Sequence, residues 1–123
     1  MKIQESGENY LETILMLEHK NGTVRSIDIA NELSYTKASV SRAMSILKKA
    51  GHIVMERDGR IQLTDSGRSI ANQIFERHEM LTQYLIALGV TPETAAADAC
   101  RIEHVISAES FEKIKAHAVE KNQ

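Results

Sequence analysis

Two segments of the sequence carry side chains that bind metal ions in proteins. One runs from Asp98 to His104 and reads DACRIEH, and the other is the tripeptide RHE around His78. Residues at positions i, i+3 and i+4 of a helix share one face, so the Cys100 sulfur, the Glu103 carboxylate and a His104 imidazole nitrogen can converge on one point. A mixed set of sulfur, oxygen and nitrogen donors suits a first-row transition ion better than calcium or magnesium. The pattern therefore indicates the chemistry of a divalent-metal site.

Each of these side chains also has an interpretation without a metal. His78 lies on an apolar helical stripe, where a lone histidine is usually a core residue with a satisfied hydrogen bond. Cys100 is more often a small buried apolar residue than a ligand, and Glu103 can be an exposed helix charge. The second cluster favours the metal, because an acid and an imidazole beside the apolar stripe of this helix would be costly without a partner. That stripe consists of Ala95, Ala99, Ile102 and Ile106.

Length and composition bound the kind of protein. The 123 residues suffice for one small domain, or for two sub-domains that share a helix, without stabilising disulfides. The single cysteine cannot form an internal bridge, and the start of the chain, residues 1–5, lacks the apolar run of a signal peptide. No stretch approaches the roughly 18 apolar residues of a membrane span, so we expect a cytoplasmic protein with no membrane partner. The absence of tryptophan and the few glycines and prolines indicate a mostly helical fold.

The first half of the sequence predicts a helix-turn-helix. Residues 5–20 read as a helix with one apolar side. Ser26 then caps a short helix, and a brief turn follows at residues 34–35. Thr36 caps a longer helix that ends at Gly51. Two helices this short, joined by so tight a turn, are typical of a helix-turn-helix.

A hairpin is predicted directly afterwards. Beyond Gly51 the apolar period changes from that of a helix to the two-residue period of a strand. The dipeptide of Asp58 and Gly59 separates the runs 53–57 and 60–63, and Asp-Gly between alternating runs is a strong hairpin signal. A hairpin directly after a helix-turn-helix makes a winged helix.

The second half predicts three further helices. Thr64 or Asp65 caps a long helix that ends at Gly89. Pro92 opens the next helix at its first turn, and Ser107 caps the last one. The whole pattern indicates a mainly α-helical protein.

The helix-turn-helix presents a short, polar and basic surface that suits DNA. In such motifs the first residues of the second helix meet base edges, and Arg42 there can bond bidentately to guanine. Arg57 and Arg60 flank the wing tip, where a phosphate or a minor groove would lie. Residues 23–68 carry a surplus of three positive charges within a chain of net charge -2, which fits contact with a polyanion. The alternative is a solvated helix face beside an ordinary hairpin. The predicted DNA-binding residues are Thr36, Lys37, Ser39, Ser41, Arg42, Arg57 and Arg60.

Four motifs carry a resemblance to a known family. They are ENYLETI at residues 8–14, LTDSGR at 63–68, RHE at 77–79 and CRIEH at 100–104. Over its whole length the chain resembles the DtxR/MntR family of metal-dependent transcriptional repressors. The resemblance implies a homodimer in which metal joins the N-terminal helix to the dimerisation helices. The loaded form would bind operators upstream of metal-uptake genes.

The resemblance also implies a ligand set, which consists of Glu12, His78, Cys100, Glu103, His104 and the Asn9 position. The chain is short, as manganese-sensing members are, yet it has Cys100 as iron sensors do, and Asn9 stands where an Asp or a Met is expected. Thiolate favours Fe(II), Co(II), Ni(II) or Zn(II) over Mn(II), whereas carboxylate and amide oxygens are hard ligands. We therefore carry Mn(II) and Fe(II) as the physiological candidates and expect Zn(II), Co(II) and Ni(II) to bind in vitro.

The sequence thus predicts a winged helix-turn-helix DNA-binding domain over residues 1–70 and a helical metal-binding and dimerisation domain over residues 71–123. The predicted function is a metal-dependent repressor of metal-uptake genes that binds double-stranded operator DNA as a homodimer and has no catalytic residue. One alternative is a winged-helix regulator that ignores metal. Another is a small metallohydrolase with Glu79 or Glu103 as general base, which would need an open coordination position and a substrate cleft. The chain has no H-E-x-x-H motif, and we expect no residues to spare for a cleft.

Overall fold

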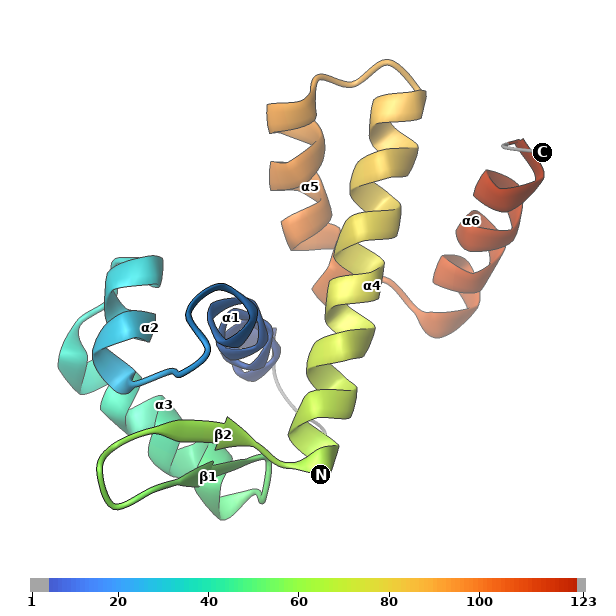
Figure 1. Cartoon of the computed structure of the whole chain (residues 1–123). Helices are drawn as coiled ribbons and strands as arrows, with labels where there is room; N and C mark the ends of the chain where they lie inside the picture. The colour runs from blue at the N-terminus through green and yellow to red at the C-terminus, as the bar shows by residue number, and fades with distance from the viewer. Residues whose placement is uncertain (1–4, 122–123) are drawn as a thin grey trace. The chain divides into compact units, whose positions relative to one another are not determined.

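The computed structural model describes residues 5–121, which form six helices and one two-stranded hairpin (Figure 1). In chain order the elements are α1 (Glu5–Asn21), α2 (Ser26–Leu33), α3 (Lys37–Lys49), β1 (Ile53–Met55), β2 (Ile61–Leu63), α4 (Asp65–Ala87), α5 (Pro92–Val105) and α6 (Ala108–Lys121). The mainly α-helical fold predicted from the sequence is therefore confirmed. The chain divides into two compact units between Asn72 and Gln73, a point that falls within α4.

Two expectations concerned secretion and membranes. The first was argued partly from residues 1–4, which lie outside the described residues. For the second, none of the described helices combines the length and the apolar character that a membrane crossing requires.

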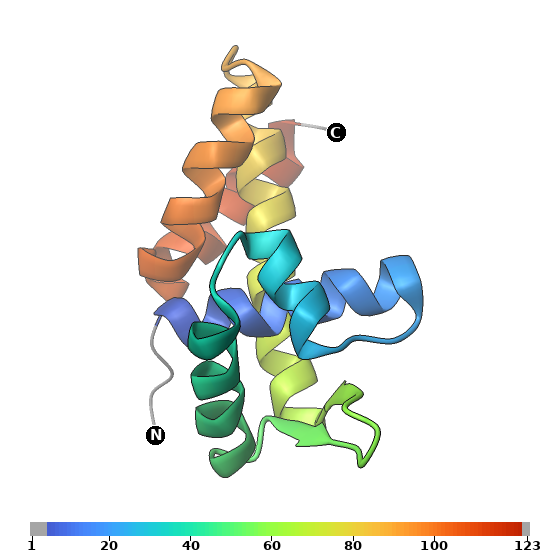
Figure 2. The same cartoon turned by 90° about the vertical axis from the view of Figure 1, so that its left-hand side faces the viewer.

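The first unit has a core built on α1. The apolar side chains of this helix recur with the helical period, and Leu11, Ile14 and Leu15 are almost fully buried. α1 packs against α2, α3 and β2. Val40 and Met44 of α3 are buried as well. The helix-turn-helix and the hairpin therefore rest on a common core, and both can be followed in Figure 2.

The helix-turn-helix forms as predicted, with one correction at its start. Thr36 precedes α3, and its Oγ1 accepts a hydrogen bond of 3.1 Å from the Ser39 backbone amide, which is the N-cap contact expected of it. Ser26, by contrast, is the first residue of α2 and not its cap. Arg25 occupies the cap position, and its backbone amide donates to the Asp28 carboxylate at 2.9 Å. The Asp28 carboxylate thus accepts the amide of the cap residue, as the acid of a capping box does.

The hairpin also forms, but its connection is longer than the Asp-Gly pair predicts. The antiparallel register pairs Ile53 with Leu63, Val54 with Gln62 and Met55 with Ile61. The Glu56 amide donates to the Arg60 carbonyl at 2.8 Å and so extends the pairing by one residue beyond each strand. The turn covers residues 57–59 and is closed by the Gly59 amide, which donates to the Glu56 carbonyl at 3.0 Å. The Asp58 carboxylate accepts the Arg60 amide at 3.1 Å. Gly59 has a φ of 90°, which glycine adopts without steric cost.

A glycine allows α4 to begin close against the base of the hairpin. A Cβ atom on Gly67 would lie 2.0 Å from the His52 carbonyl oxygen, so a larger residue would push the two backbones apart. The Thr64 hydroxyl accepts the Gly67 amide at 3.2 Å. Of the two caps that the sequence allowed, Thr64 is therefore the N-cap of α4, and Asp65 is the first residue of the helix.

The second unit consists of the rest of α4 with α5 and α6. Its core takes one residue from each helix, namely Leu81, Ala99 and Phe111. Pro92 is the first residue of α5, as predicted. Ser107 caps α6, since its hydroxyl accepts the Ser110 amide at 3.1 Å. The candidate metal ligands of α4 and α5 lie beside this small core.

Candidate metal centre and candidate nucleic-acid interface

Glu103 is the central residue of the candidate metal site. It lies near the end of α5, and its side chain is 0% exposed. α4 places His78 beside it, with the His78 Nδ1 atom 2.8 Å from Glu103 Oε2. The interpretation of Glu103 as an exposed helix charge is therefore wrong. His78 has the hydrogen bond expected of a core histidine, and it also stands next to the other candidate ligands of this unit.

The second carboxylate oxygen of Glu103 has different surroundings. Glu103 Oε1 is buried and has no hydrogen-bond partner among residues 5–121. His104 Nε2 lies 3.3 Å from it without forming a hydrogen bond, and the His104 side chain is only 4% exposed. A carboxylate oxygen and an imidazole nitrogen are thus held side by side away from water.

These atoms fit a divalent metal ion. A buried acceptor without a hydrogen bond costs about 1–3 kcal/mol, more when it is charged, and a bound cation would remove that cost. Because an ionised carboxylate can only accept, His78 Nδ1 is the donor of its bond to Glu103. Histidine ligands commonly donate their other ring N–H to a carboxylate in this way. Carboxylate oxygen and imidazole nitrogen are donors that first-row transition ions accept.

The remaining predicted ligands are placed differently. Cys100 lies one turn before Glu103 on α5 and is exposed, so the alternative of a buried core cysteine is wrong. On α1, Glu12 is 4% exposed and Asn9 is half-buried. Coordination of a metal by these three residues stays a prediction.

The predicted DNA-binding residues lie on exposed parts of the first unit. α3 buries Val40, Met44 and Leu47 and so presents its other face to solvent. The residues concerned are all exposed: Thr36, Lys37, Ser39, Ser41, Arg42, Arg57 and Arg60. The Thr36 hydroxyl donates to Ser39 Oγ at 2.9 Å, so these two side chains are held together at the start of α3. Hydroxyl groups and cations thus lie at the N-terminal end of α3, the part of a recognition helix that enters the major groove of DNA.

Arg25, Asp58 and Arg60 form a cluster of ion pairs at the wing. Arg60 Nε lies 2.8 Å from Asp58 Oδ2, and Arg25 Nη2 lies 3.8 Å from the same oxygen. The hydrogen bond from the Arg60 amide, followed by that from its side chain, lowers the pKa of the Asp58 carboxyl. Sequence reasoning missed Arg25, because only the fold brings the start of α2 to the wing. The only hint in the neighbouring sequence was that Arg25 is a basic residue directly before a helix.

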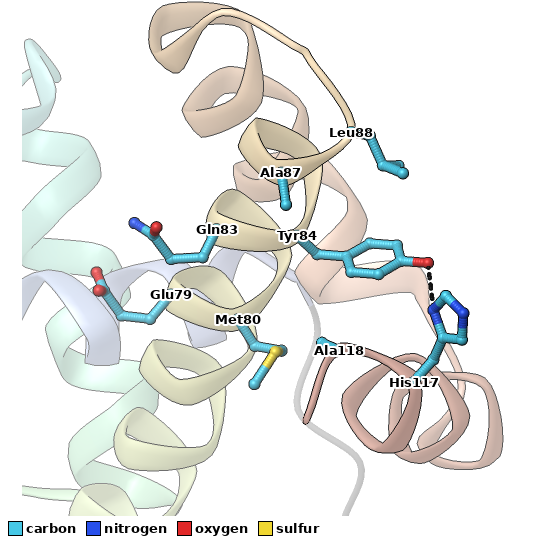
Figure 3. Close-up of a pocket in the computed structure, with 8 residues that line it drawn as sticks. All are labelled: Glu79, Met80, Gln83, Tyr84, Ala87, Leu88, His117 and Ala118. Atoms are coloured by element: carbon cyan, nitrogen blue, oxygen red, sulfur yellow. Dashed lines mark hydrogen bonds between the residues drawn. The ribbon is translucent and has the colours of Figure 1, made fainter. Parts of the chain in front are cut away.

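A groove of about 420 Å³ lies between α4 and α6 (Figure 3). Its lining is largely apolar, and the Tyr84 hydroxyl and His117 Nδ1 lie 2.9 Å apart across it. The expectation that the chain could form no cleft was therefore wrong, because α6 lies away from part of α4 and leaves a hollow. Glu79 lines the groove, but in Figure 3 its carboxylate points away from Tyr84 and His117. The cluster around Glu103 is not part of this lining.

Known protein families match nearly the whole sequence. Residues 2–60 match the family described as "Iron dependent repressor, N-terminal DNA binding domain". Residues 64–118 match "Iron dependent repressor, metal binding and dimerisation domain". The HTH-type transcriptional regulator MntR of Geobacillus kaustophilus (strain HTA426) is 36% identical over 109 residues, which make up 89% of this chain and 77% of that protein. The regulator of the same name from Bacillus subtilis (strain 168) is 35% identical with the same coverage.

Two solved structures are similar to this chain in fold. A manganese-dependent transcriptional repressor in complex with manganese is 25% identical, with a TM-score of 0.82, and the match covers 90% of this chain and 51% of that one. The chain thus spans about half of that repressor. The hypothetical protein SSo2273 from Sulfolobus solfataricus shares the fold, with 22% identity, a TM-score of 0.72, and coverage of 94% of this chain and 89% of that one.

Proposed function

The chain belongs to the iron-dependent repressor family, and we propose that it is a metal-activated repressor whose affinity for operator DNA rises when a divalent ion binds. It is accordingly a DNA-binding transcriptional regulator and not an enzyme. The observation that carries the proposal of a metal switch is the buried Glu103 carboxylate. One of its oxygens bonds to His78, and the other lies beside His104 with no hydrogen bond to a described residue.

We propose Glu103 and His104 as ligands because Glu103 Oε1 and His104 Nε2 lie 3.3 Å apart in a buried position. His78 is proposed with them because its Nδ1 atom lies 2.8 Å from the same carboxylate. Glu12, Cys100 and the Asn9 side chain are proposed as further ligands on the resemblance to the family and on the chemistry of their donor atoms. When bound, the ion supplies a double positive charge that several donor groups can share. The helices α4 and α5 hold the first three donors in place before binding, so little ordering is required of them.

The DNA-binding role falls to the winged helix of the first unit. Thr36 and Lys37 lie at the start of α3 and Arg42 lies one turn further on, and we propose that this part of the helix meets base edges. Arg57 and Arg60 of the wing are proposed to contact phosphates or a minor groove. The family's dimerisation domain implies a homodimer. Two winged helices related by a twofold axis should read a palindrome with half-sites about 34–36 Å apart.

We propose that the dimer interface lies in the chain from about residue 70 onward. The apolar groove between α4 and α6 supports this proposal, as do the exposed apolar side chains of Leu88 and Val105, which are 65% and 73% exposed. Apolar area of this kind is stabilised when it is covered. Because the partner is operator DNA, the protein is proposed to act in the cytoplasm.

The physiological metal is proposed to be Mn(II) or Fe(II). The oxygen and nitrogen donors around Glu103 suit both ions, and a Cys100 thiolate would favour Fe(II). Zn(II), Co(II) and Ni(II) should bind in vitro, since affinities of such sites generally rise along the first row. The predicted targets are genes for metal uptake.

Neither alternative is favoured by a specific observation. A metallohydrolase needs ligands and a general base in a common cleft, but the groove between α4 and α6 does not contain Glu103 or its two histidines. A regulator that ignores metal would leave the buried Glu103 oxygen unexplained.

Fluorescence anisotropy with an operator selected from random sequences tests the proposal. The protein, kept under reducing conditions, should bind this DNA more tightly with Mn(II), Fe(II), Co(II) or Zn(II) than with Mg(II) or chelator. Coupling between metal and DNA of about 1–3 kcal/mol, a change in affinity of roughly 5- to 150-fold, would suffice for a switch. Equal affinity with and without metal would favour the metal-independent regulator.

A further inference from the structure

We propose that Arg77 is a positioning residue of the metal site, which fixes the backbone of Glu103 by binding the end of α5. The inference rests on the proposed function for the assignment of Glu103 and His104 as ligands. It concerns a residue that would not touch the ion, and its hydrogen bonds to α5 and its ring contact with α6 lie within the second unit.

The Arg77 guanidinium binds two carbonyl groups at the end of α5. Its Nη1 atom donates to the Glu103 carbonyl at 3.2 Å and to the Ile106 carbonyl at 3.1 Å. α5 ends at Val105, so the last carbonyls of the helix have no following helical amide to bind. A cation at a helix C-terminus also interacts favourably with the helix dipole. Arg77 therefore holds the last turn of α5 in its helical conformation, and this turn carries both ligands.

Arg77 and its neighbour His78 hold the same residue at two points. His78 binds the Glu103 side chain through Oε2 at 2.8 Å, and Arg77 binds the Glu103 backbone oxygen. A side chain fixed at both its backbone and one carboxylate oxygen has little freedom left. The position of Oε1 is then determined by α4, before any ion is bound.

The guanidinium is itself held by α6. Its central carbon lies 5.5 Å from the centre of the Phe111 ring, and Phe111 is 5% exposed in the core of this unit. A planar guanidinium can stack on a ring while its N–H groups bind carbonyls, whereas the lysine ammonium is a compact point charge. Lysine is therefore a poor replacement for Arg77, although it preserves the charge.

The direction of the change in metal affinity shows whether Arg77 acts by positioning Glu103 or only through its positive charge. Arg77→Met removes a positive charge near the site, which by Coulomb's law alone favours binding of a dication. Positioning predicts the reverse, because the last turn of α5 loses its cap. Both Arg77→Met and Arg77→Lys should weaken binding of Mn(II) and Co(II) by about 10- to 100-fold, which is typical for the loss of a group that orients a ligand.

Two control variants test whether a change in metal affinity comes from lower stability or from a weaker contact between α6 and α4. Lys115→Met removes an exposed ion pair with Glu76 that also joins α6 to α4 but does not involve α5. Ile114→Ala removes apolar packing against the same core. Ile114→Ala should lower the melting temperature, and both variants should keep the metal affinity of the wild type. In the metal-free protein, only the Arg77 variants should speed hydrogen exchange in the last turn of α5.

Full-length protein is titrated with MnCl2 and CoCl2, and binding is followed by calorimetry and by the Co(II) absorption spectrum. Weaker binding by both Arg77 variants, with unchanged binding by the controls, supports the proposal. Unchanged or tighter binding by Arg77→Met overturns it and leaves the proposed function intact. A loss of affinity in Ile114→Ala that matches the loss in the Arg77 variants also overturns it, because the effect would then follow stability. A wild-type protein that binds neither ion would contradict the proposed function first, and the role of Arg77 with it.

Discussion

Replacement of Glu103 by glutamine shows whether this residue is a metal ligand or only one half of a structural ion pair. The carboxylate is fully buried and makes one charge-assisted hydrogen bond, with His78. Glutamine keeps the shape and can still accept that bond through its amide oxygen. The change to a neutral bond should cost about 1 kcal/mol, and removal of a buried charge should offset part of this. We therefore expect the free energy of unfolding of the metal-free protein to change by less than about 2 kcal/mol.

The large effect should appear only when metal is present. A ligand at 100 times its dissociation constant stabilises the folded state by about 2.7 kcal/mol. For a chain of this size that gain raises the melting temperature by roughly 10 °C. Glu103→Gln should lose nearly all of this increase, together with the metal-dependent rise in DNA affinity.

Thermal unfolding at one protein concentration, with chelator and with saturating Mn(II), measures both quantities. Protein concentration is kept constant because the stability of a dimer depends on it. If Glu103 served only as half of a buried ion pair, its replacement should lower the free energy of unfolding by about 3–5 kcal/mol whether or not metal is present. Such a loss in chelator, or a full Mn(II) response in Glu103→Gln, would refute the assignment of this residue as a ligand.

Three further changes test other parts of the molecule. Arg42→Ala should weaken specific DNA binding by about 1–3 kcal/mol and relax operator preference, whereas Lys37→Ala should weaken all sequences alike; intact preference in Arg42→Ala by anisotropy would mean that another residue reads the bases. Cys100→Glu should improve the response to Mn(II) relative to Zn(II) and should abolish a near-ultraviolet thiolate band of the Co(II) protein; a wild type without the band would remove Cys100 from the ligand set. Asp58 has a pKa lowered by Arg60 from the usual 3.8, so its stabilisation is present above that pH and lost as the pH falls through the folded pKa. An NMR titration midpoint for Asp58 at or above 3.8, or one that Arg60→Ala did not raise, would argue against that ion pair.

Sequence alone predicted the features that depend on a few neighbouring residues. The caps at Thr36 and Ser107 involve contacts only three residues apart, and Pro92 is suited to the first turn of a helix by its own ring. The apolar period of α1 similarly predicted which of its faces is buried. Because these features depend on residues close together in the sequence, they can be predicted before the fold is known.

Features set by contacts between distant elements could not be predicted in the same way. Gly67 is required by the carbonyl of His52, fifteen residues earlier, and nothing in the neighbouring sequence reveals that contact. The turn of the wing includes Arg57 because the Gly59 amide binds the Glu56 carbonyl, whereas the Asp-Gly pair alone suggested a tighter turn.

The candidate site shows the same division. Cys100, Glu103 and His104 all lie on α5, as their spacing predicts, while convergence of their donor atoms on one point stays a prediction. Positions three apart differ by about 60° around a helix, which is too coarse to decide which side chain reaches the core. Packing against α4 buries Glu103 and leaves Cys100 exposed. The role of Arg77 depends on the same packing, because its partners lie on α5 and α6.

The central claim is that metal and DNA bind to one coupled system, and the dissociation constant for Mn(II) measured with and without operator tests it most directly. Coupling between two binding sites is reciprocal, so DNA must tighten Mn(II) binding by the same factor by which Mn(II) tightens DNA binding. We expect that factor to be about 5- to 150-fold for the wild type and absent in Glu103→Gln. An Mn(II) affinity that is identical with and without operator DNA would contradict a metal-activated repressor.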